Sequence, residues 1–148
     1  MLRLYKGVIM EESLYRVMVS LLLTNEQGKV FLVRNNESNN NYGVCSSYLP
    51  NGETVFSTAA NLASQKLNIS INEKDLLVFL SMQILKEEET TFVFFVHASR
   101  WKGDIKVEGT YDDSMWVSTE LLPLNTVDYI KRAVQCYKKN ISFTVFQN

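Results

Sequence analysis

The segment from Ser46 to Ile69 has the form of a loop that leads into a helix, and it holds few chemically active side chains. Its one carboxylate is Glu53 and its one cation is Lys66. Positions 62, 65 and 66 have i, i+3 and i+4 spacing, so on a helix their side chains share one face and could converge on an ion. Mg²⁺ and Mn²⁺ prefer hard oxygen ligands, whereas this face offers Leu62, Gln65 and an ammonium group. The spacing would suit a metal ion, but the residue types do not.

The ammonium group of Lys66 adds to this mismatch. It would repel a divalent cation by on the order of a few kcal/mol at a partly screened separation. It could instead pair with Glu53 and neutralise that carboxylate in place of a metal. We therefore expect an amphipathic scaffold helix here and not a catalytic one.

Acidic residues elsewhere in the chain could supply ligands from outside the helix. Glu108, Asp112 and Asp113 lie in a polar segment, and a rewired metal site of Glu53 with Asp112 or Asp113 is one alternative, although no spacing rule supports it. The run Glu87–Glu89 is typical of a solvated hairpin tip. No other part of the sequence has the spacing of a metal site.

The single histidine, His97, lies in the apolar run FVFFVHA. Among the many roles of histidine, a structural imidazole suits this position better than a ligand or a catalytic base.

Length, charge and cysteine usage exclude several classes of protein. The 148 residues suit one domain, and a composition of 46% hydrophobic and 21% charged residues is ordinary for a globular fold. A net charge of −1 argues against a nucleic-acid partner, which would favour a basic patch. Cys45 and Cys136 follow no metal or redox spacing and indicate reduced thiols. Without a signal-like or bilayer-length apolar run, we expect a cytoplasmic protein with no membrane partner.

The first half of the chain has a clear element pattern. Residues 15–24 are β-branched or aliphatic almost throughout, which predicts a strand buried on both faces. A turn at Gly28 should join them to a second strand, residues 29–34, in a hairpin. The Asn-rich tract 35–43 is a predicted loop, either at the rim of a site or on the surface without a role. Helical spacing over Val55–Leu67 predicts a helix that ends at Asn68, since Asn tolerates the left-handed conformation.

The second half has two predicted strands, residues 76–85 and 91–99, joined by a charged turn. A short strand, Met115–Val117, and a brief helix capped at Ser118–Glu120 should follow. A last helix is expected over residues 126–139, before a C-terminal extension, residues 141–148.

This order of elements predicts an α+β fold, an α/β/α sandwich in which helices cover a mixed sheet. We expect residues 1–148 to form a single domain with a core over about residues 15–137.

The segment from Ser47 to Ile69 and the order of elements resemble the Nudix family. Its signature is Gly, five residues, Glu, seven residues, Arg-Glu, an aliphatic, one residue, Glu-Glu, one residue, Gly and an aliphatic. Laid on this sequence without a gap, the signature agrees at Glu53, Ala63 and Ile69, and Gly52 and Ala59 stand where the family commonly has Gly and a small residue. The flanking KVFLVR and MWVSTELLPL segments also resemble those of the family.

The resemblance implies a Nudix fold and hydrolysis of nucleoside diphosphates linked to another group, with Mg²⁺ or Mn²⁺ held by helix glutamates. Glu53 is the only box glutamate retained and would be the catalytic candidate. The departures are Ser47 for Gly, Asn61 for Arg, Leu62 for Glu, Gln65 and Lys66 for Glu-Glu, and Asn68 for Gly. Loss of a positioned base costs about 10² to 10⁴ in rate, and loss of the metal several kcal/mol. We therefore expect impaired catalysis and no metal or other cofactor at the family site.

Three functions remain open on the sequence. The first is a binding or regulatory protein that keeps a cleft for a nucleotide-type ligand, with contacts from Arg34, Tyr42, Tyr48 and Trp101. The second is an active, divergent pyrophosphohydrolase that uses Glu53 with Mg²⁺ or Mn²⁺. The third is an interaction module with an empty cleft, whose residues 141–146 add a strand to a partner or to a second copy in a homodimer.

Overall fold

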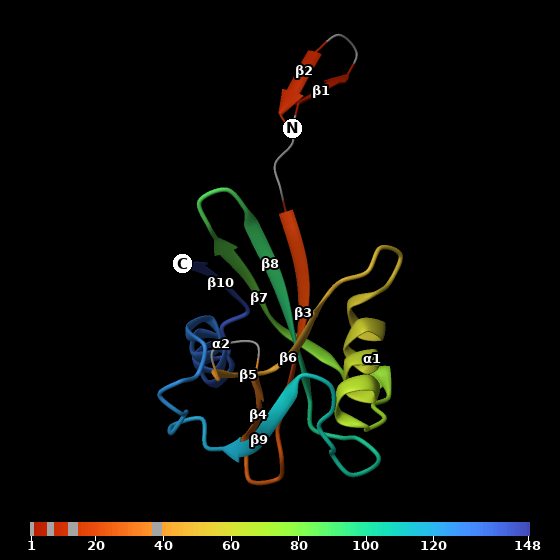
Figure 1. The fold of residues 1–148 in the computed structure, drawn as a ribbon, viewed down its shortest axis with the longest axis vertical. Coiled ribbons are helices and arrows are strands. Elements are labelled where there is room, and N and C mark those ends of the chain that lie inside the picture. Colours follow the sequence, from red (N-terminus) through yellow and green to blue (C-terminus); the bar gives the residue numbers. More distant parts are fainter. Residues whose placement is uncertain (1, 6–7, 12–14, 37–39) are drawn as a thin grey trace.

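The computed structural model describes residues 2–5, 8–11, 15–36 and 40–148, so part of the Asn-rich loop, residues 37–39, lies outside the described residues. Within them, the strands form three sheets (Figure 1). The five-stranded sheet has the spatial order β10 (Phe143–Gln147), β7 (Leu77–Leu85), β8 (Thr90–Ala98), β3 (Tyr15–Leu23) and β6 (Cys45–Tyr48). The three-stranded sheet has the order β5 (Tyr42–Gly43), β4 (Val30–Asn35) and β9 (Tyr111–Val117). A separate hairpin pairs β1 (Leu2–Tyr5) with β2 (Val8–Glu11).

Helix α1 (Val55–Leu67) has the predicted bounds, and the capping residues explain them. Thr54 accepts a hydrogen bond from the N–H of Ser57, and the Ser57 hydroxyl accepts one from the N–H of Thr54, which forms a capping box. At the other end Asn68 takes the left-handed conformation with φ 57°, so the prediction that it terminates the helix is confirmed.

Helix α2 (Asp128–Lys139) begins two residues later than predicted and has the predicted end, followed by Asn140, a left-handed C-cap. Its first residue follows Val127, which makes no side-chain capping hydrogen bond. A short 3₁₀ helix, η1 (Glu73–Asp75), precedes β7. In the part of the chain that the structure describes, no helix has the length and apolarity needed to cross a bilayer.

The two helices cover opposite faces of the five-stranded sheet (Figure 1). Because side chains alternate along a strand, Val19 and Leu21 of β3 enter the core under α1, whereas Leu22 enters the core under α2. This explains the nearly continuous apolar run and confirms a mixed sheet between helices.

The turn predicted between residues 15–24 and 29–34 is present, but the prediction that these two strands pair as a hairpin is wrong. The N–H of Gly28 donates to the carbonyl of Asn25 at 3.0 Å, and Gly28 has the predicted positive φ, at 74°. One bridge then joins Thr24 to Val30, after which the two strands enter different sheets. A strand has two edges, and those of β3 are occupied by parallel β8 and antiparallel β6, so β4 pairs with β9 instead.

The segment after the β9 strand also differs from the prediction. The strand begins at Tyr111 and not at Met115. The brief helix at residues 118–120 is wrong, because Ser118 forms a turn: its hydroxyl accepts the N–H of Glu120 at 3.2 Å and its carbonyl accepts the N–H of Leu121 at 3.0 Å. The hydroxyl competes with helical hydrogen bonding, and Pro123 soon follows.

The C-terminal segment pairs within its own chain. Residues 143–147 form β10, parallel to β7, and Phe146 packs against the core under α2. One edge of this segment is therefore occupied by β7, and the addition of its other edge to a partner or to a second copy stays a prediction. The predicted strand pair of residues 76–85 and 91–99 is confirmed as the antiparallel pair β7 and β8.

Candidate functional site

The face of α1 that would suit a metal carries no carboxylate. Leu62 is buried, with 5% of its surface exposed, Gln65 is exposed and Lys66 is half-buried. Asn61 is exposed as well. Among all described residues, no group of three or more His, Cys, Asp or Glu side chains is placed to hold a metal ion.

The pair of Glu53 with Lys66 that the sequence allows does not form in the described chain. Glu53 accepts a hydrogen bond from the hydroxyl of Ser57 at 2.8 Å, and no ion pair of the described chain joins it to Lys66. The two residues lie just before α1 and in its last turn, so a rise of about 1.5 Å per residue separates them by roughly 20 Å. The Lys66 ammonium instead lies over the backbone of Gly109, 3.4 Å from where a Cβ would stand.

The acidic candidates Asp112 and Asp113 form a network with two of the ligand candidates. Arg34 donates from Nε to Asp112 Oδ1 at 2.9 Å, and the hydroxyl of Tyr42 donates to Asp113 Oδ2. The Arg34 guanidinium also lies 5.7 Å from the centre of the Tyr42 ring. Glu53 has no part in these contacts, so the structure does not assemble the rewired metal site. Glu108 is exposed, and its N–H donates to the carbonyl of Lys66.

The hydrogen bond from Tyr42 predicts a pH effect on stability. It lowers the pKa of Asp113 below its ordinary value, as do the N–H of Ser114 and nearby Arg34. A carboxyl group with a lowered folded pKa stabilises the fold above its unfolded pKa of about 3.9, and this contribution is lost as pH falls through the folded pKa. We expect Tyr42→Phe to raise the Asp113 pKa and to make the unfolding free energy fall less steeply with acidification, measured by NMR titration and by urea unfolding.

The exposed Tyr15 provides the control for this experiment, because Tyr15→Phe removes a hydroxyl that does not contact Asp113. An Asp113 titration that is the same in Tyr42→Phe and in the unmodified protein would contradict the prediction.

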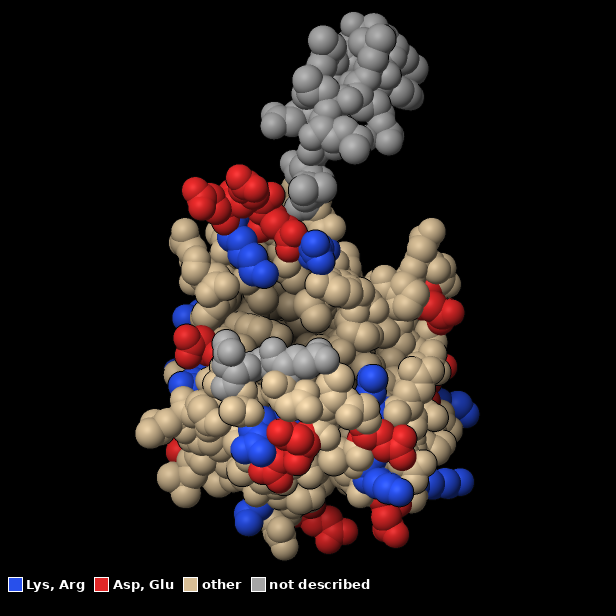
Figure 2. Space-filling view, in the orientation of Figure 1, with Lys and Arg blue, Asp and Glu red and all other residues tan. Residues whose placement is uncertain are grey.

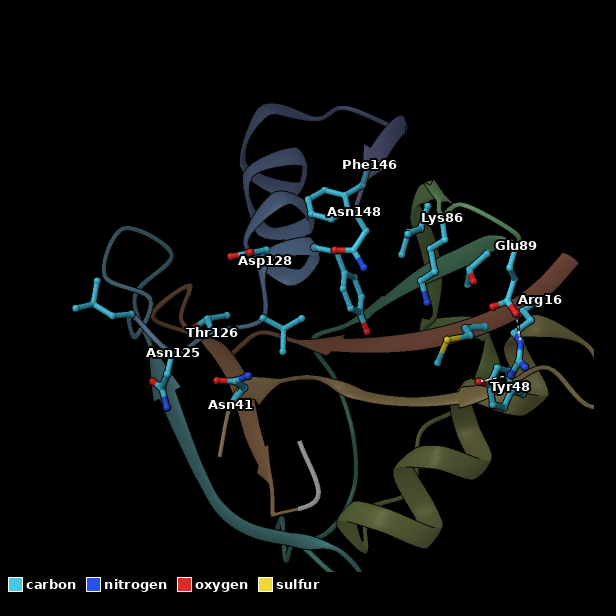
Figure 3. A pocket seen from close by; sticks show the side chains of 16 residues that line it. Arg16, Asn41, Tyr48, Lys86, Glu89, Asn125, Thr126, Asp128, Phe146 and Asn148 are labelled. Carbon is cyan, nitrogen blue, oxygen red and sulfur yellow. Dashed lines mark hydrogen bonds and ion pairs between the residues drawn. The ribbon is translucent and has the colours of Figure 1, made fainter. Parts of the chain in front are cut away.

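A cavity of about 510 Å³ lies between the five-stranded sheet and the segment that leads into α2 (Figure 3). The space-filling view shows a hollow on the corresponding face, below the acidic tip of the β7–β8 hairpin (Figure 2). Met18 of β3, Thr91 of β8 and Ile84 of β7 line it from the sheet. Residues 124–129 line the opposite side, and none of positions 62, 65 and 66 is in the lining.

One end of this cavity has three uncharged polar side chains, beside the exposed carboxylate of Asp128 (Figure 3). Asn41, Asn125 and Thr126 lie together there (Figure 3). Thr126 is 4% exposed, and its hydroxyl has no hydrogen-bond partner in the described chain. A buried hydroxyl without a partner costs free energy and is uncommon in folded proteins, so it calls for an explanation.

The backbone of Tyr42 holds this end in place. Its N–H donates to the carbonyl of Asn125 and its carbonyl accepts the N–H of Val127, both at 2.9 Å. The side-chain amide of Asn125 donates to the carbonyl of Asn40 at 2.8 Å. Tyr42 itself is buried, so the structure places it beneath the lining and not in it.

The other end of the cavity is charged. Arg16, Tyr48, Lys86 and Glu89 lie there (Figure 3). Arg16 donates from Nε to Glu89 Oε2 at 2.8 Å and from Nη1 to the hydroxyl of Tyr48 at 2.9 Å. Of the four ligand candidates, Tyr48 alone is part of this lining.

The remaining candidate, Trp101, lies at a different place. Its ring stacks on Trp116 with centroids 6.1 Å apart, and it packs against the core under α1. It lines a second cavity of about 390 Å³ with Arg100 and Lys102. Tyr48 and Trp101 therefore do not share a site in the described chain.

Two side chains that could act as nucleophile or base have packing roles. Burial raises the pKa of the Cys45 thiol to about 12, so it is neutral at physiological pH and a poor nucleophile. Burial lowers the pKa of His97, whose Nε2 lies 2.8 Å from the Thr24 hydroxyl and whose ring packs on Phe79 and Tyr137. These contacts favour the structural interpretation of His97.

Comparison with known proteins relates this arrangement to solved structures. No family model and no curated protein matches the sequence. By structure, the chain is similar to the MutT protein from Methanosarcina mazei Go1, with a TM-score of 0.72 and 17% identity over 88% of this chain and 97% of that one. It is similar to the MutT NUDIX hydrolase from Burkholderia pseudomallei, with a TM-score of 0.71 and 14% identity over 82% and 96% of the two chains. The chain has a Nudix-like fold. An Ap4A hydrolase from C. elegans is also similar, with a TM-score of 0.62 and 9% identity over 82% and 96%.

The Nudix-like fold thus retains the helix over residues 55–67 onto which the family signature maps. At the signature positions 62, 65 and 66 that helix presents an aliphatic side chain, an amide and an ammonium group. This helix face is not part of the lining of the 510 Å³ cavity. The residues that do line it, such as Arg16, Lys86 and Thr126, are far apart in sequence. Sequence reasoning missed them because no local spacing connects them.

Proposed function

We propose that this protein binds a nucleotide-type ligand in the 510 Å³ cavity without a metal ion. We also propose that it does not hydrolyse the ligand to a detectable product. The observation that carries the proposal is that Thr126, a residue of the cavity lining, has a buried hydroxyl without a hydrogen-bond partner in the described chain. A ligand that bonds to this hydroxyl would remove the penalty of leaving it unpaired. The cavity volume falls within the range of about 300 to 1,000 Å³ usual for small-molecule sites.

The polar groups of the cavity support this class of ligand. The amides of Asn41 and Asn125 each present both a donor and an acceptor, which suits the edge of a base. Tyr48 is 55% exposed at the other end, where its hydroxyl accepts a hydrogen bond from Arg16. The C. elegans protein of similar fold is an Ap4A hydrolase, and we extend a ligand with linked phosphates to this chain as part of the proposal.

The proposed lack of turnover has a separate basis. Mg²⁺ or Mn²⁺ would need oxygen ligands, and the α1 face supplies one neutral amide, that of Gln65, beside Leu62 and Lys66. A protein that binds and does not turn over its ligand would act as a sensor or regulator, since a fold hosts functions beyond the chemistry of its relatives. We place this role in a reducing, cytoplasmic setting, in accord with the two buried free thiols.

Calorimetry with ADP-ribose, Ap4A and nucleoside triphosphates tests the proposal, each in EDTA and in excess Mg²⁺ or Mn²⁺. We expect at least one ligand to bind with the same Kd in both conditions. Phosphorus NMR of the same mixtures, incubated at high protein concentration, should show no product.

Two outcomes would overturn the proposal. Failure of all these ligands to bind would remove the binding function. Metal-dependent product formation that is lost in Glu53→Gln would establish the active, divergent pyrophosphohydrolase instead.

A further inference from the structure

The side chains that line the charged end of the cavity include two cations and one carboxylate. Arg16 and Lys86 both line it, and Glu89 is the carboxylate that contacts Arg16. Lys86 has no ion pair within the described residues. Asp128 also lines the cavity, but its side chain is 83% exposed and lies 3.7 Å from Lys131 of its own helix. The lining at this end therefore has two cations and one carboxylate, while Glu87 and Glu88 of the same hairpin tip lie outside the lining.

The Arg16 guanidinium is held in a fixed orientation. Glu89 accepts from its Nε at 2.8 Å, the Tyr48 hydroxyl accepts from its Nη1 at 2.9 Å, and the group lies 5.4 Å from the centre of the Tyr48 ring. A guanidinium has five N–H donors, so these two bonds leave donors that can bind an anion. A guanidinium that is already oriented loses less side-chain entropy when it binds a phosphate.

The Glu89 carboxylate occupies one side of the Arg16 fork. Glu89 lies at the tip of the β7–β8 hairpin, where its backbone carbonyl accepts a hydrogen bond from the N–H of Lys86 at 3.1 Å. The hairpin thus carries both the second cation and the carboxylate that competes for the first. A ligand anion would share Arg16 with Glu89 or displace it.

We infer that Arg16 and Lys86 form a subsite for the phosphate groups of the ligand, and that Glu89 competes with those phosphates for Arg16. This inference rests on the proposed function and gives the ligand a direction. Its phosphates lie at the β7–β8 tip, and its uncharged polar part lies toward Thr126. Phosphates held there do not contact positions 62, 65 and 66, which are outside the cavity lining.

Inorganic pyrophosphate in EDTA is a direct probe of the subsite, because it carries the anion without a base. We expect Arg16→Gln and Lys86→Gln each to weaken pyrophosphate binding about tenfold, since a hydrogen bond to a charged group is lost. Glu89→Gln should tighten binding severalfold, because the competing charge is removed. The logarithmic dependence of the affinity on salt should become shallower in Arg16→Gln and Lys86→Gln.

Lys102→Gln is the matched control, because Lys102 is an exposed lysine that lines the other cavity, with Trp101. Its pyrophosphate affinity should equal that of the unmodified protein. Arg16→Lys keeps the positive charge but loses the planar set of guanidinium donors. A pyrophosphate affinity between that of the unmodified protein and that of Arg16→Gln would support directed hydrogen bonds from Arg16.

The outcomes separate this inference from the proposed function. Absence of pyrophosphate binding, or equal affinity in the unmodified protein and in Arg16→Gln and Lys86→Gln, would overturn the subsite. If nucleotides still bind in that case, the proposed function survives. Pyrophosphate binding with the expected variant effects, but with no nucleotide bound, would support the subsite and overturn the proposed function.

Discussion

The combined variant Asn61→Arg, Leu62→Glu, Gln65→Glu and Lys66→Glu is expected to make the stability of the protein depend on Mn²⁺ or Mg²⁺. Leu62 is 5% exposed, so Leu62→Glu places a carboxylate in a largely buried position. Leaving a buried charge unpaired costs several kcal/mol. The variant should therefore unfold at a much lower temperature than the unmodified protein in EDTA. A divalent cation would then bind the three new carboxylates on one face and restore stability.

The size of the metal effect can be estimated from mass action. A cation present at about 100 times its Kd stabilises the folded state by about 2.7 kcal/mol. Thermal unfolding in EDTA and in excess Mn²⁺ measures it. The control is Leu62→Glu alone, which has the buried charge but a single new carboxylate, and which should be destabilised in both conditions. A shift of the same size in the unmodified protein would contradict our view that its helix holds no metal.

The local parts of the fold were predictable because local residues determine them. Thr54 and Asn68 flank α1 as caps, and the caps fix its bounds whatever packs against it. The nearly continuous apolar run of β3 likewise predicts a strand that is buried on both faces. The absence of carboxylates at i, i+3 and i+4 on α1 is of the same kind, since one helix face is read from one short segment.

The errors concern interactions between distant segments. The pairing of β3 with β8 joins residues that are distant in sequence, such as Tyr15 and Thr90. Because β8 occupies one edge of β3, β4 pairs in another sheet. Nothing in residues 15–34 records which strand takes the edges of β3. The absence of a pair of Glu53 with Lys66 has a simpler cause, because the rise of a helix already separates its two ends beyond the reach of a lysine.

The candidate cavity is the least predictable feature for the same reason. Its charged end joins β3 to the β7–β8 tip, and its other end depends on Tyr42, whose backbone holds Asn125 and Val127. Arg16, Lys86 and Thr126 are each ordinary in their own segment. Their shared surface arises from the order of strands in the sheet and from the path of the chain into α2.

Thr126→Val is expected to stabilise the unliganded protein and to weaken ligand binding. Removing a buried hydroxyl that lacks a partner in the described chain should raise the unfolding free energy by about 1 kcal/mol, because the unpaired group no longer lies in the fold. The same change removes the hydrogen bond that the ligand would make, so affinity should fall by about five- to tenfold. Urea unfolding and calorimetry with the ligand that binds best measure the two effects.

Thr58→Val is a matched control, because Thr58 and Thr126 are both 4% exposed but differ in hydrogen bonding. The Thr58 hydroxyl donates to the carbonyl of Thr54 at 2.9 Å, so its loss should lower the unfolding free energy by about 1 kcal/mol and leave ligand affinity unchanged. If Thr126→Val stabilises the protein and Thr58→Val destabilises it, the Thr126 hydroxyl is available to a ligand, whereas the Thr58 hydroxyl contributes to the stability of the fold. Equal losses of stability would mean that the Thr126 hydroxyl is already satisfied, and the main support for the binding function would then be lost.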